Sequence, residues 1–294
     1  MDLHAYLRER RNMLEAAIDR ALPPAGDLPQ RLHGAIRYSV MAPGKRLRPI
    51  LVMASAEAVG GTPEAVLPTA CALECIHAFS LIHDDLPCMD DDDTRRGRPT
   101  SHKVFGEAIA LLAGDALFAL AFELVASNAA AVAPDRVVAA VGQVARASGT
   151  LGMVGGQVMD IESEGCTTTG EWLQQIHARK TGALLTASSV VGALLAGGDE
   201  DQIECLRRYG SHVGLAFQIA DDILDVVGDE GKIGKPVGSD QKQDKATYPK
   251  AFGLQRSLEM ARDEAADAVA AIEPLGPPAE PLRAIAHYIV ERDL

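Results

Sequence analysis

Apolar residues recur at intervals of three and four along almost the whole chain. Alanine and leucine are abundant, and sustained alternation of Val, Ile or Thr with polar residues is missing. A spacing of three and four places apolar side chains on one face of a helix, whereas a strand needs apolar residues at every second position. The pattern therefore predicts an all-α protein.

Clusters of glycine and proline divide this pattern into about ten predicted helices. The breaks lie near residues 23–24, 43–44, 60–61, 99, 134, 165–170, 197–198, 228–238 and 274–281. The chain shows no repeat of fixed period, and no linker is long enough to separate two domains. We predict a single helical domain over residues 1–294, folded as a bundle.

Two groups of aspartates follow apolar segments. Six aspartates fall within residues 84–93, directly after the apolar stretch 70–82, and a second apolar run ends at Asp221, Asp222 and Asp225. A charge run taken alone is usually a solvated loop, which is the alternative interpretation. Here the aspartates begin where apolar helices end, and like charges so close together need a cation to neutralise them. The two groups therefore indicate a paired metal site.

The spacing within each group suggests how its carboxylates meet. Asp84 and Asp90 are six residues apart and would point about 120° from each other on an ideal helix. Pro87 lies between them, and a proline-induced kink or bulge would bring the two carboxylates together. Asp221 and Asp225 are four residues apart and share one helix face without distortion. Both groups can therefore present carboxylates to a common space.

Short groups of cationic residues accompany the aspartates. Lys45, Arg46 and Arg48 lie at a predicted helix start, where unpaired backbone N–H groups already favour an anion. His77 lies two helical turns before the first aspartate and has nearly the same azimuth. A solvated basic turn and a satisfied core histidine are the respective alternatives. If the aspartates face inward, these residues can line the same cavity.

Polar residues also interrupt the apolar helices between the two groups. Gln157, Asp160, Lys180 and Thr181 lie in otherwise apolar segments. Buried polar groups need partners, so these residues either bond neighbouring helices or line a cavity. After the second group, the glycine-rich polar stretch 228–240 would either close as a lid over a bound anion or serve as a plain connection.

Composition narrows the choice of partner and location. The formal net charge of −13 argues against a nucleic-acid partner, because polyphosphate backbones are bound by broad cationic surfaces. The five cysteines show neither Cys-x-x-Cys pairs nor zinc spacing, which favours a reducing, cytoplasmic setting. No uninterrupted apolar run reaches the roughly 18 residues that cross a bilayer, and no signal peptide is evident. These features predict a soluble protein that binds small anions.

A site lined by aspartates would repel a phosphate unless divalent cations lay between protein and ligand. Magnesium fits this requirement, because it takes one or two carboxylates and completes its octahedron with water and phosphate oxygens. The cationic residues within 45–48 and Arg96 would hold a second anion directly. The sequence therefore predicts two phosphorylated substrates that are bound by different means.

The order of these motifs resembles the trans-isoprenyl diphosphate synthases, and most closely the bacterial farnesyl diphosphate synthases. The resemblance lies in Asp84-Asp85-x4-Asp90 followed by Arg95-Arg96, in Gly44-Lys45-Arg46, in Lys180-Thr181 and in Gln218-x2-Asp221-Asp222-x2-Asp225. It extends over nearly the whole chain, from Tyr38 to Arg292. Each motif alone is moderately specific, whereas the set is highly specific.

The resemblance implies the isoprenoid synthase fold, a helical bundle around a deep central cavity, usually as a homodimer. It implies a prenyltransferase that joins isopentenyl diphosphate to an allylic diphosphate by ionisation, condensation and proton loss. Magnesium, roughly three ions per site with diphosphate bound, would be the cofactor. Its ligands would be Asp84, Asp90 and Asp221, with Asp85, Asp222 and Asp225 as further ligands or behind them.

The resemblance also assigns the substrate contacts. Arg95, Lys180, Lys235 and Lys245 would hold the allylic diphosphate. Lys45, Arg46, His77 and Arg96, with Arg48 as a weaker assignment, would hold isopentenyl diphosphate. Thr181 and Gln218, with the Lys180 carbonyl, would direct partial negative charge at the developing carbocation.

In this family, product length is controlled at the fourth and fifth residues before the first aspartate, here Ser80 and Phe79. Phe79 would form a floor under the growing chain and favour (2E,6E)-farnesyl diphosphate, made from dimethylallyl and geranyl diphosphate. On an ideal helix Phe79 points about 140° from Asp84, so its role rests on the resemblance. The alternatives are a geranylgeranyl diphosphate synthase, a non-catalytic prenyl synthase subunit and a cation-binding protein without chemistry.

Overall fold

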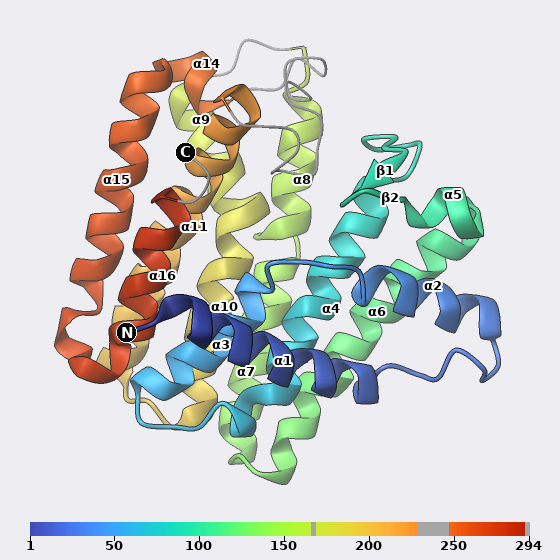
Figure 1. The fold of residues 1–294 in the computed structure, drawn as a ribbon, viewed down its shortest axis with the longest axis horizontal. Helices are drawn as coiled ribbons and strands as arrows, with labels where there is room; N and C mark the ends of the chain where they lie inside the picture. The colour runs from blue at the N-terminus through green and yellow to red at the C-terminus, as the bar shows by residue number, and fades with distance from the viewer. Residues whose placement is uncertain (166–168, 228–246, 292–294) are drawn as a thin grey trace.

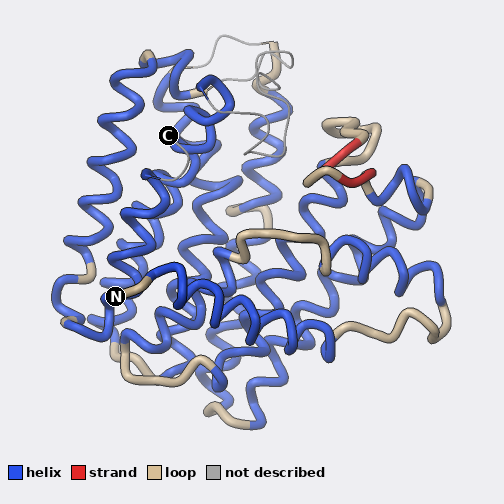
Figure 2. Tube along the Cα trace, viewed as in Figure 1, coloured by secondary structure: helices blue, strands red, loops and turns tan. Residues whose placement is uncertain are grey.

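The computed structural model describes residues 1–165, 169–227 and 247–291, and this part of the chain is almost entirely helical (Figure 1). The only strands in these ranges are β1 (Thr94–Arg95) and β2 (Arg98–Pro99), which pair antiparallel. Figure 2 shows strand confined to this small ribbon. The prediction of an all-α fold is confirmed.

The helices follow one another with short connections. They are α1 (Leu3–Ala21), α2 (Gln30–Val40), α3 (Leu47–Ala58), α4 (Leu67–Asp84), α5 (Ser101–Phe105), α6 (Glu107–Ser127), α7 (Pro134–Ser148), α8 (Met153–Glu162), α9 (Gly170–His177), α10 (Ala183–Ala196), α11 (Glu200–Val227), α14 (Tyr248–Phe252), α15 (Leu254–Ala271) and α16 (Glu280–Glu291). Short helical turns are η1 (Glu64–Val66), η2 (Asn128–Ala130), η3 (Ala178–Gly182), η4 (Glu273–Leu275) and η5 (Pro277–Ala279).

Helix α10 lies at the centre of the bundle and packs against α3, α4, α7 and α11. Its residues are apolar or small on every face, and Leu184, Val190 and Ala193 have no exposed surface. A helix that is apolar all round is stable only when other elements cover it on all sides. The buried core therefore forms around α10, and it extends into α3, α4 and α11.

Helices α4 and α11 carry the two aspartate groups to one end of the bundle. Pro68 lies in the first turn of α4, where its missing N–H costs nothing, and the following residues 69–76 are all buried. Helix α11 packs against α10, α15 and α16. In Figure 1 the C-terminal ends of α4 and α11 both lie at the top of the view, near α8 and β1.

Three stretches are long and apolar enough to cross a membrane by length and composition alone: Glu64–Asp84, Glu107–Ala130 and Pro134–Glu162. The sequence analysis considered only uninterrupted apolar runs, whereas these helices meet the criterion of length and mean composition with polar residues among the apolar ones. In this fold 61% of the first stretch is buried inside the bundle.

Candidate active site

The first aspartate group begins where α4 ends. Helix α4 stops at Asp84, and the backbone then turns back so that the Asp90 N–H donates to the Asp84 carbonyl at 2.9 Å. A second bond, from Met89 N–H to the Leu86 carbonyl at 2.9 Å, closes the turn. The sequence predicted a kink or bulge at Pro87; the structure ends the helix at Asp84 and folds a turn. The backbones of Asp84 and Asp90 therefore meet, and the metal site itself stays a prediction.

Asp85 has a different environment from its neighbour Asp84. It is buried, and one of its carboxylate oxygens accepts from both Nε and Nη2 of Arg95 at 2.6 Å. Burial raises the pKa of Asp85 to about 6, although Arg95 opposes the shift. Arg95 also reaches Asp92, at 3.2 Å. Asp85 therefore fixes an arginine beside the metal-binding aspartates, which agrees with a position behind the ligands.

The three aspartates of α11 also differ in their contacts. Asp221 is exposed and Asp225 is partly exposed, whereas Asp222 is buried. Asp222 accepts from the Gln218 side-chain amide at 2.8 Å and from the Tyr248 backbone N–H at 2.9 Å. It therefore anchors α14 to α11. Asp221 and Asp225 are the members of this group that remain directed away from the core.

Lys180 and Thr181 lie in η3, a single turn of π-helix between α9 and α10. Such turns interrupt regular hydrogen bonding and are frequent at functional sites. Helix α8 packs closely against this turn, because a Cβ added to Gly156 would lie only 2.2 Å from the Lys180 backbone nitrogen. The Lys180 ammonium donates to Asp160 of α8 at 2.6 Å. Glycine at position 156 therefore allows the helix contact that brings these two side chains together.

Lys180 and Thr181 connect the two aspartate groups. Burial alone would lower the pKa of Lys180, but the nearby carboxylate of Asp160, together with Asp84 and Asp90, raises it. Thr181 Oγ1 donates to Gln218 Oε1 of α11 at 2.7 Å. Asp160, Lys180 and Thr181 thus bond neighbouring helices, which is the first of the two interpretations of these polar residues. That they line a cavity stays a prediction.

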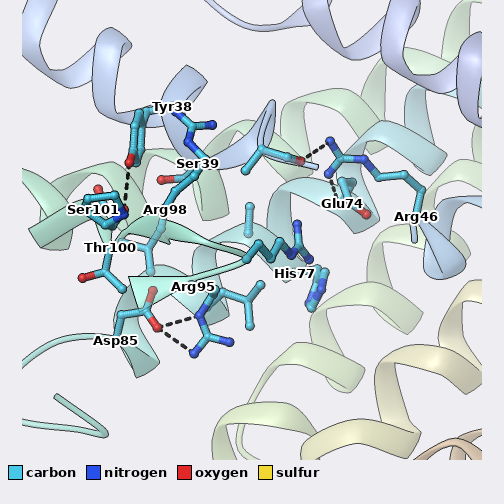
Figure 3. A pocket seen from close by; sticks show the side chains of 16 residues that line it. Tyr38, Ser39, Arg46, Glu74, His77, Asp85, Arg95, Arg98, Thr100 and Ser101 are labelled. Atoms are coloured by element: carbon cyan, nitrogen blue, oxygen red, sulfur yellow. Dashed lines mark hydrogen bonds and ion pairs between the residues drawn. The ribbon is translucent and has the colours of Figure 1, made fainter. Parts of the chain in front are cut away.

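A pocket lies beside the first aspartate group, between α2, α4 and the β1–β2 ribbon (Figure 3). It encloses about 520 Å³ that is not filled by atoms, part of it open to solvent. Four predicted substrate residues line it: Arg46, His77, Arg95 and Arg96. Its lining also includes Tyr38, Ser39, Glu74, Asp85, Arg98, Thr100 and Ser101. The sequence analysis named the first four of these residues as substrate contacts, which stays a prediction, and it assigned no role to Arg98, Thr100 or Ser101.

Arg46 is tied to the protein rather than open to a ligand. It is 4% exposed, donates to Glu74 at 2.5 Å and to the Ala42 carbonyl at 2.8 Å, and has a left-handed backbone. Its assignment to isopentenyl diphosphate is therefore not supported by its contacts. Burial lowers the pKa of Arg48 to about 10, and its Nε has no hydrogen-bond partner in the described residues. Arg46 Nε also lacks a hydrogen-bond partner, and Arg48 does not line this pocket, so the assignment of Arg48 stays a prediction.

Arg96 is presented by the tight turn of the ribbon. Arg96 and Gly97 both have positive φ, 54° and 72°, as the two-residue turn that matches the twist of paired strands requires. A Cβ added to Gly44 would lie 2.7 Å from Arg96 Nη1. The guanidinium therefore rests against the Gly44 backbone, and the glycine of the Gly44-Lys45-Arg46 motif makes room for it.

His77 shares this pocket with several arginines. Its pKa lies well below the usual value because it is buried and because Arg48, Arg96, Arg95 and Arg46 surround it. The imidazole is therefore neutral at pH 7. It can contribute a hydrogen bond to an anion without adding a further charge to the cluster.

Three predicted lysines lie elsewhere or outside the described chain. Lys45 is exposed and lines a separate hollow with Arg11, Leu47 and Tyr288. It does not line the pocket that contains Arg96. Lys235 and Lys245, and with them the predicted lid, lie outside the described residues.

The predicted chain-length residues lie one turn below Asp84. The Phe79 ring lies 5.0 Å from that of Phe118 on α6 and 4.8 Å from that of His83. Phe118 in turn contacts Phe122 at 5.2 Å. Ser80 donates to the His77 carbonyl at 3.0 Å. Phe79 thus begins an aromatic row between α4 and α6, and its role as a floor under the growing chain stays a prediction.

Comparison with known proteins identifies the family. Residues 29–273 match the family model described as polyprenyl synthetase. The chain belongs to the polyprenyl synthetase family, the trans-isoprenyl diphosphate synthases. It is 48% identical to a geranylgeranyl diphosphate synthase of Cyanophora paradoxa, over 99% of this chain and 97% of that protein.

Two further members of this family are similar to the chain. One is the heterodimeric geranylgeranyl pyrophosphate synthase large subunit 1, chloroplastic, of Arabidopsis thaliana, 48% identical over 99% of this chain and 80% of that protein. The other is the crystal structure of an FPP/GFPP synthase from Zymomonas mobilis, with a TM-score of 0.88 and 37% identity, covering 98% of this chain and 99% of that one. The resemblance to this family, and the isoprenoid synthase fold it implied, are confirmed.

Proposed function

We propose that this prenyltransferase condenses isopentenyl diphosphate with allylic diphosphates and that its main product is geranylgeranyl diphosphate. The observation that carries the reaction is the placement of Lys180, which lies within electrostatic reach of Asp84 and Asp90 while its neighbour Thr181 bonds to α11. The proposed site for the first diphosphate, which would be bound through metal ions held by carboxylates, thus adjoins a second site lined by arginines. Two diphosphates bound by different means are the substrates this arrangement fits.

The donor set suits magnesium. Asp84 and Asp90 approach each other across the turn, and in the described residues no group of three His, Cys, Asp or Glu side chains could hold a metal ion alone. Magnesium commonly takes one or two carboxylates and leaves its other positions to water and substrate phosphates. We assign Asp84, Asp90 and Asp221 as its ligands. Bound magnesium would stabilise the charge that gathers on the diphosphate as its bond to carbon breaks.

The protein groups around this site act on the same charge separation. Lys180, held by Asp160, stays protonated and attracts the departing allylic diphosphate more strongly as its charge grows. Thr181 donates to Gln218, so its oxygen lone pairs and the Lys180 carbonyl can face the positive carbon. Neutral His77 and Arg96 hold the second diphosphate. The released diphosphate is the base we propose for proton loss.

The names of the similar proteins and the prediction from the sequence disagree on the length of the product. The sequence predicted farnesyl diphosphate, but most of the similar curated proteins carry geranylgeranyl in their names, at 46–48% identity. They favour the geranylgeranyl alternative. Farnesyl diphosphate is the second candidate, because the bulky Phe79 ring lies in the turn before Asp84 and packs against Phe118.

The two candidates separate in one assay. Purified protein is incubated with magnesium, isopentenyl diphosphate and each allylic starter, and the dephosphorylated products are separated by length. Geranylgeraniol as the main product supports the proposal. Farnesol as the end product, with farnesyl diphosphate refused as a starter, supports the second candidate. Failure to consume isopentenyl diphosphate with any starter would contradict the proposed reaction.

We expect Phe79→Ala to lengthen the product by at least one five-carbon unit. The change removes the ring that meets Phe118 and opens the row of aromatic side chains between α4 and α6. Product chromatography measures the shift. Tyr288→Ala, which removes a ring on α16 that meets His4, is the matched control and should leave the distribution unchanged. An unaltered distribution in Phe79→Ala would show that this ring is not the barrier.

We further propose a cytoplasmic homodimer. Leu111 and Leu112 of α6 are 45% and 52% exposed, which is unusual for adjacent leucines unless another surface covers them. The four described cysteines are all free thiols, as a reducing compartment would keep them. Light scattering of the purified protein should give twice the chain mass. A monomeric mass at micromolar concentration would contradict the dimer.

A further inference from the structure

The anion pocket contains more positive charge than its own carboxylates neutralise. Four arginines and two carboxylates line it. Glu74 is paired with Arg46, and Asp85 is paired with Arg95. In the part of the chain that the structure describes, no carboxylate lies within ion-pair distance of Arg96 or Arg98. The resemblance assigned Arg96 to a substrate, but Arg98 has no assigned role.

Arg98 faces the pocket because of the register of the ribbon. Arg95 and Arg98 are directly opposite in the β1–β2 pair. Directly opposed residues of an antiparallel pair project from the same face, so both side chains point to the same side of the ribbon. Arg95 is engaged with Asp85. Figure 3 shows Arg98 beside Tyr38, on the opposite side of the pocket from Arg46 and Glu74.

The Arg98 guanidinium is held in place without being neutralised. It lies over the Tyr38 ring, 4.2 Å from the ring centre, and Tyr38 Oη donates to the Pro99 carbonyl at 2.8 Å. A cation over an aromatic face gains roughly 0.5–1 kcal/mol at an exposed site, and it keeps its charge and its N–H donors. The Tyr38 ring thus fixes the position of the Arg98 guanidinium, and the N–H donors along the guanidinium edge remain available to a ligand.

A second polar group at this end also lacks a partner. Ser101 lines the pocket and is 4% exposed, and its Oγ has no hydrogen-bond partner in the described chain. Buried polar atoms of folded proteins are nearly always bonded, so an unbonded one needs an explanation. An anion oxygen between Arg98 and Ser101 would supply the missing acceptor.

We propose that Arg98 binds the diphosphate of isopentenyl diphosphate together with Arg96, as the outer arginine of this pocket. The inference rests on the proposed function, because it needs a second, metal-free diphosphate. Arg96 and Arg98 are the two arginines of the pocket that have no paired carboxylate. Their planar guanidinium groups can each donate two hydrogen bonds to phosphate oxygens. The competing explanation is that Arg98 only clamps the ribbon to α2 through Tyr38.

Steady-state kinetics with Arg98→Gln distinguish the two roles. A charged hydrogen bond to the substrate predicts a rise of about 10-fold to 100-fold in the KM for isopentenyl diphosphate. The KM for the allylic substrate should stay within about twofold, since Arg98 does not contact that site, and Arg98→Lys should recover part of the loss. A clamp instead predicts a lower melting temperature and equal changes in both KM values.

Tyr38→Phe is the matched control, because it removes the bond to the Pro99 carbonyl and keeps the ring under Arg98. We expect it to leave the KM for isopentenyl diphosphate within about threefold of wild type, as loss of one neutral bond implies. An unchanged KM in Arg98→Gln, with wild-type protein active, would overturn this inference alone. Wild-type protein that consumes no isopentenyl diphosphate would overturn the proposed function.

Discussion

Replacing Asp84 with asparagine should lower kcat/KM by about a thousandfold or more. The change keeps the size of the side chain and removes one carboxylate from the pair that the turn at residues 84–90 brings together. Metal stabilisation of a leaving group contributes several kcal/mol, and each 1.4 kcal/mol corresponds to about a factor of ten in rate. The measurement is isopentenyl diphosphate consumption with a saturating allylic starter, over a range of magnesium concentrations.

The control for Asp84→Asn is Asp91→Asn, which makes the same charge change seven residues later. Asp91 is exposed and follows the turn that holds Asp90. It lies outside the proposed ligand set, so its activity should stay within about threefold of wild type, since exposed charge changes are weak. Activity of Asp84→Asn within tenfold of wild type would contradict the ligand assignment. An equal loss in both variants would point to net charge rather than to ligation.

The turn at residues 84–90 shows which features local sequence rules can predict and which they cannot. The apolar pattern predicted a buried helix before Asp84, and α4 follows that prediction. The spacing argument then placed a kink or a bulge at Pro87, where the structure has a turn. The residue before a proline is disfavoured in helical conformation, so the sequence also allowed the prediction that the helix ends near Leu86. The sequence argument did not consider that the helix could end before Pro87.

Other parts of the site depend on contacts that sequence spacing cannot supply. Arg46 meets Glu74, 28 residues away, and Asp222 meets the Tyr248 backbone, 26 residues away. Both pairs form only after different helices pack together. Arg46 and Arg48 are similar in sequence terms, because each lies in the same basic motif. Only packing shows that Arg46 is paired with Glu74, whereas no carboxylate of the described residues lies within ion-pair distance of Arg48.

Glu74→Ala should lower the free energy of unfolding by about 3–5 kcal/mol, the usual cost of leaving a buried charge unpaired. The side chains of Glu74 and Arg46 are 3% and 2% exposed, and their atoms approach to 2.5 Å. The nearest other carboxylate, Glu15, lies 4.0 Å from Arg46 Nε, too far for a hydrogen bond. Urea denaturation monitored by circular dichroism measures the loss.

Two further variants separate the unpaired charge from a simple loss of contacts. Glu204→Ala breaks the exposed pair between Glu204 and Arg207, and it should cost no more than about 1 kcal/mol. The double variant Glu74→Met with Arg46→Met removes both charges and should be more stable than Glu74→Ala, because apolar replacement of a whole buried pair is often tolerated. If Glu74→Ala lowers the free energy of unfolding by less than about 1 kcal/mol, the effect is no larger than that of an exposed ion pair. That result would show that the Arg46 side chain is hydrated once Glu74 is removed. In that case Arg46 would again be available to a diphosphate, and its original assignment would regain support.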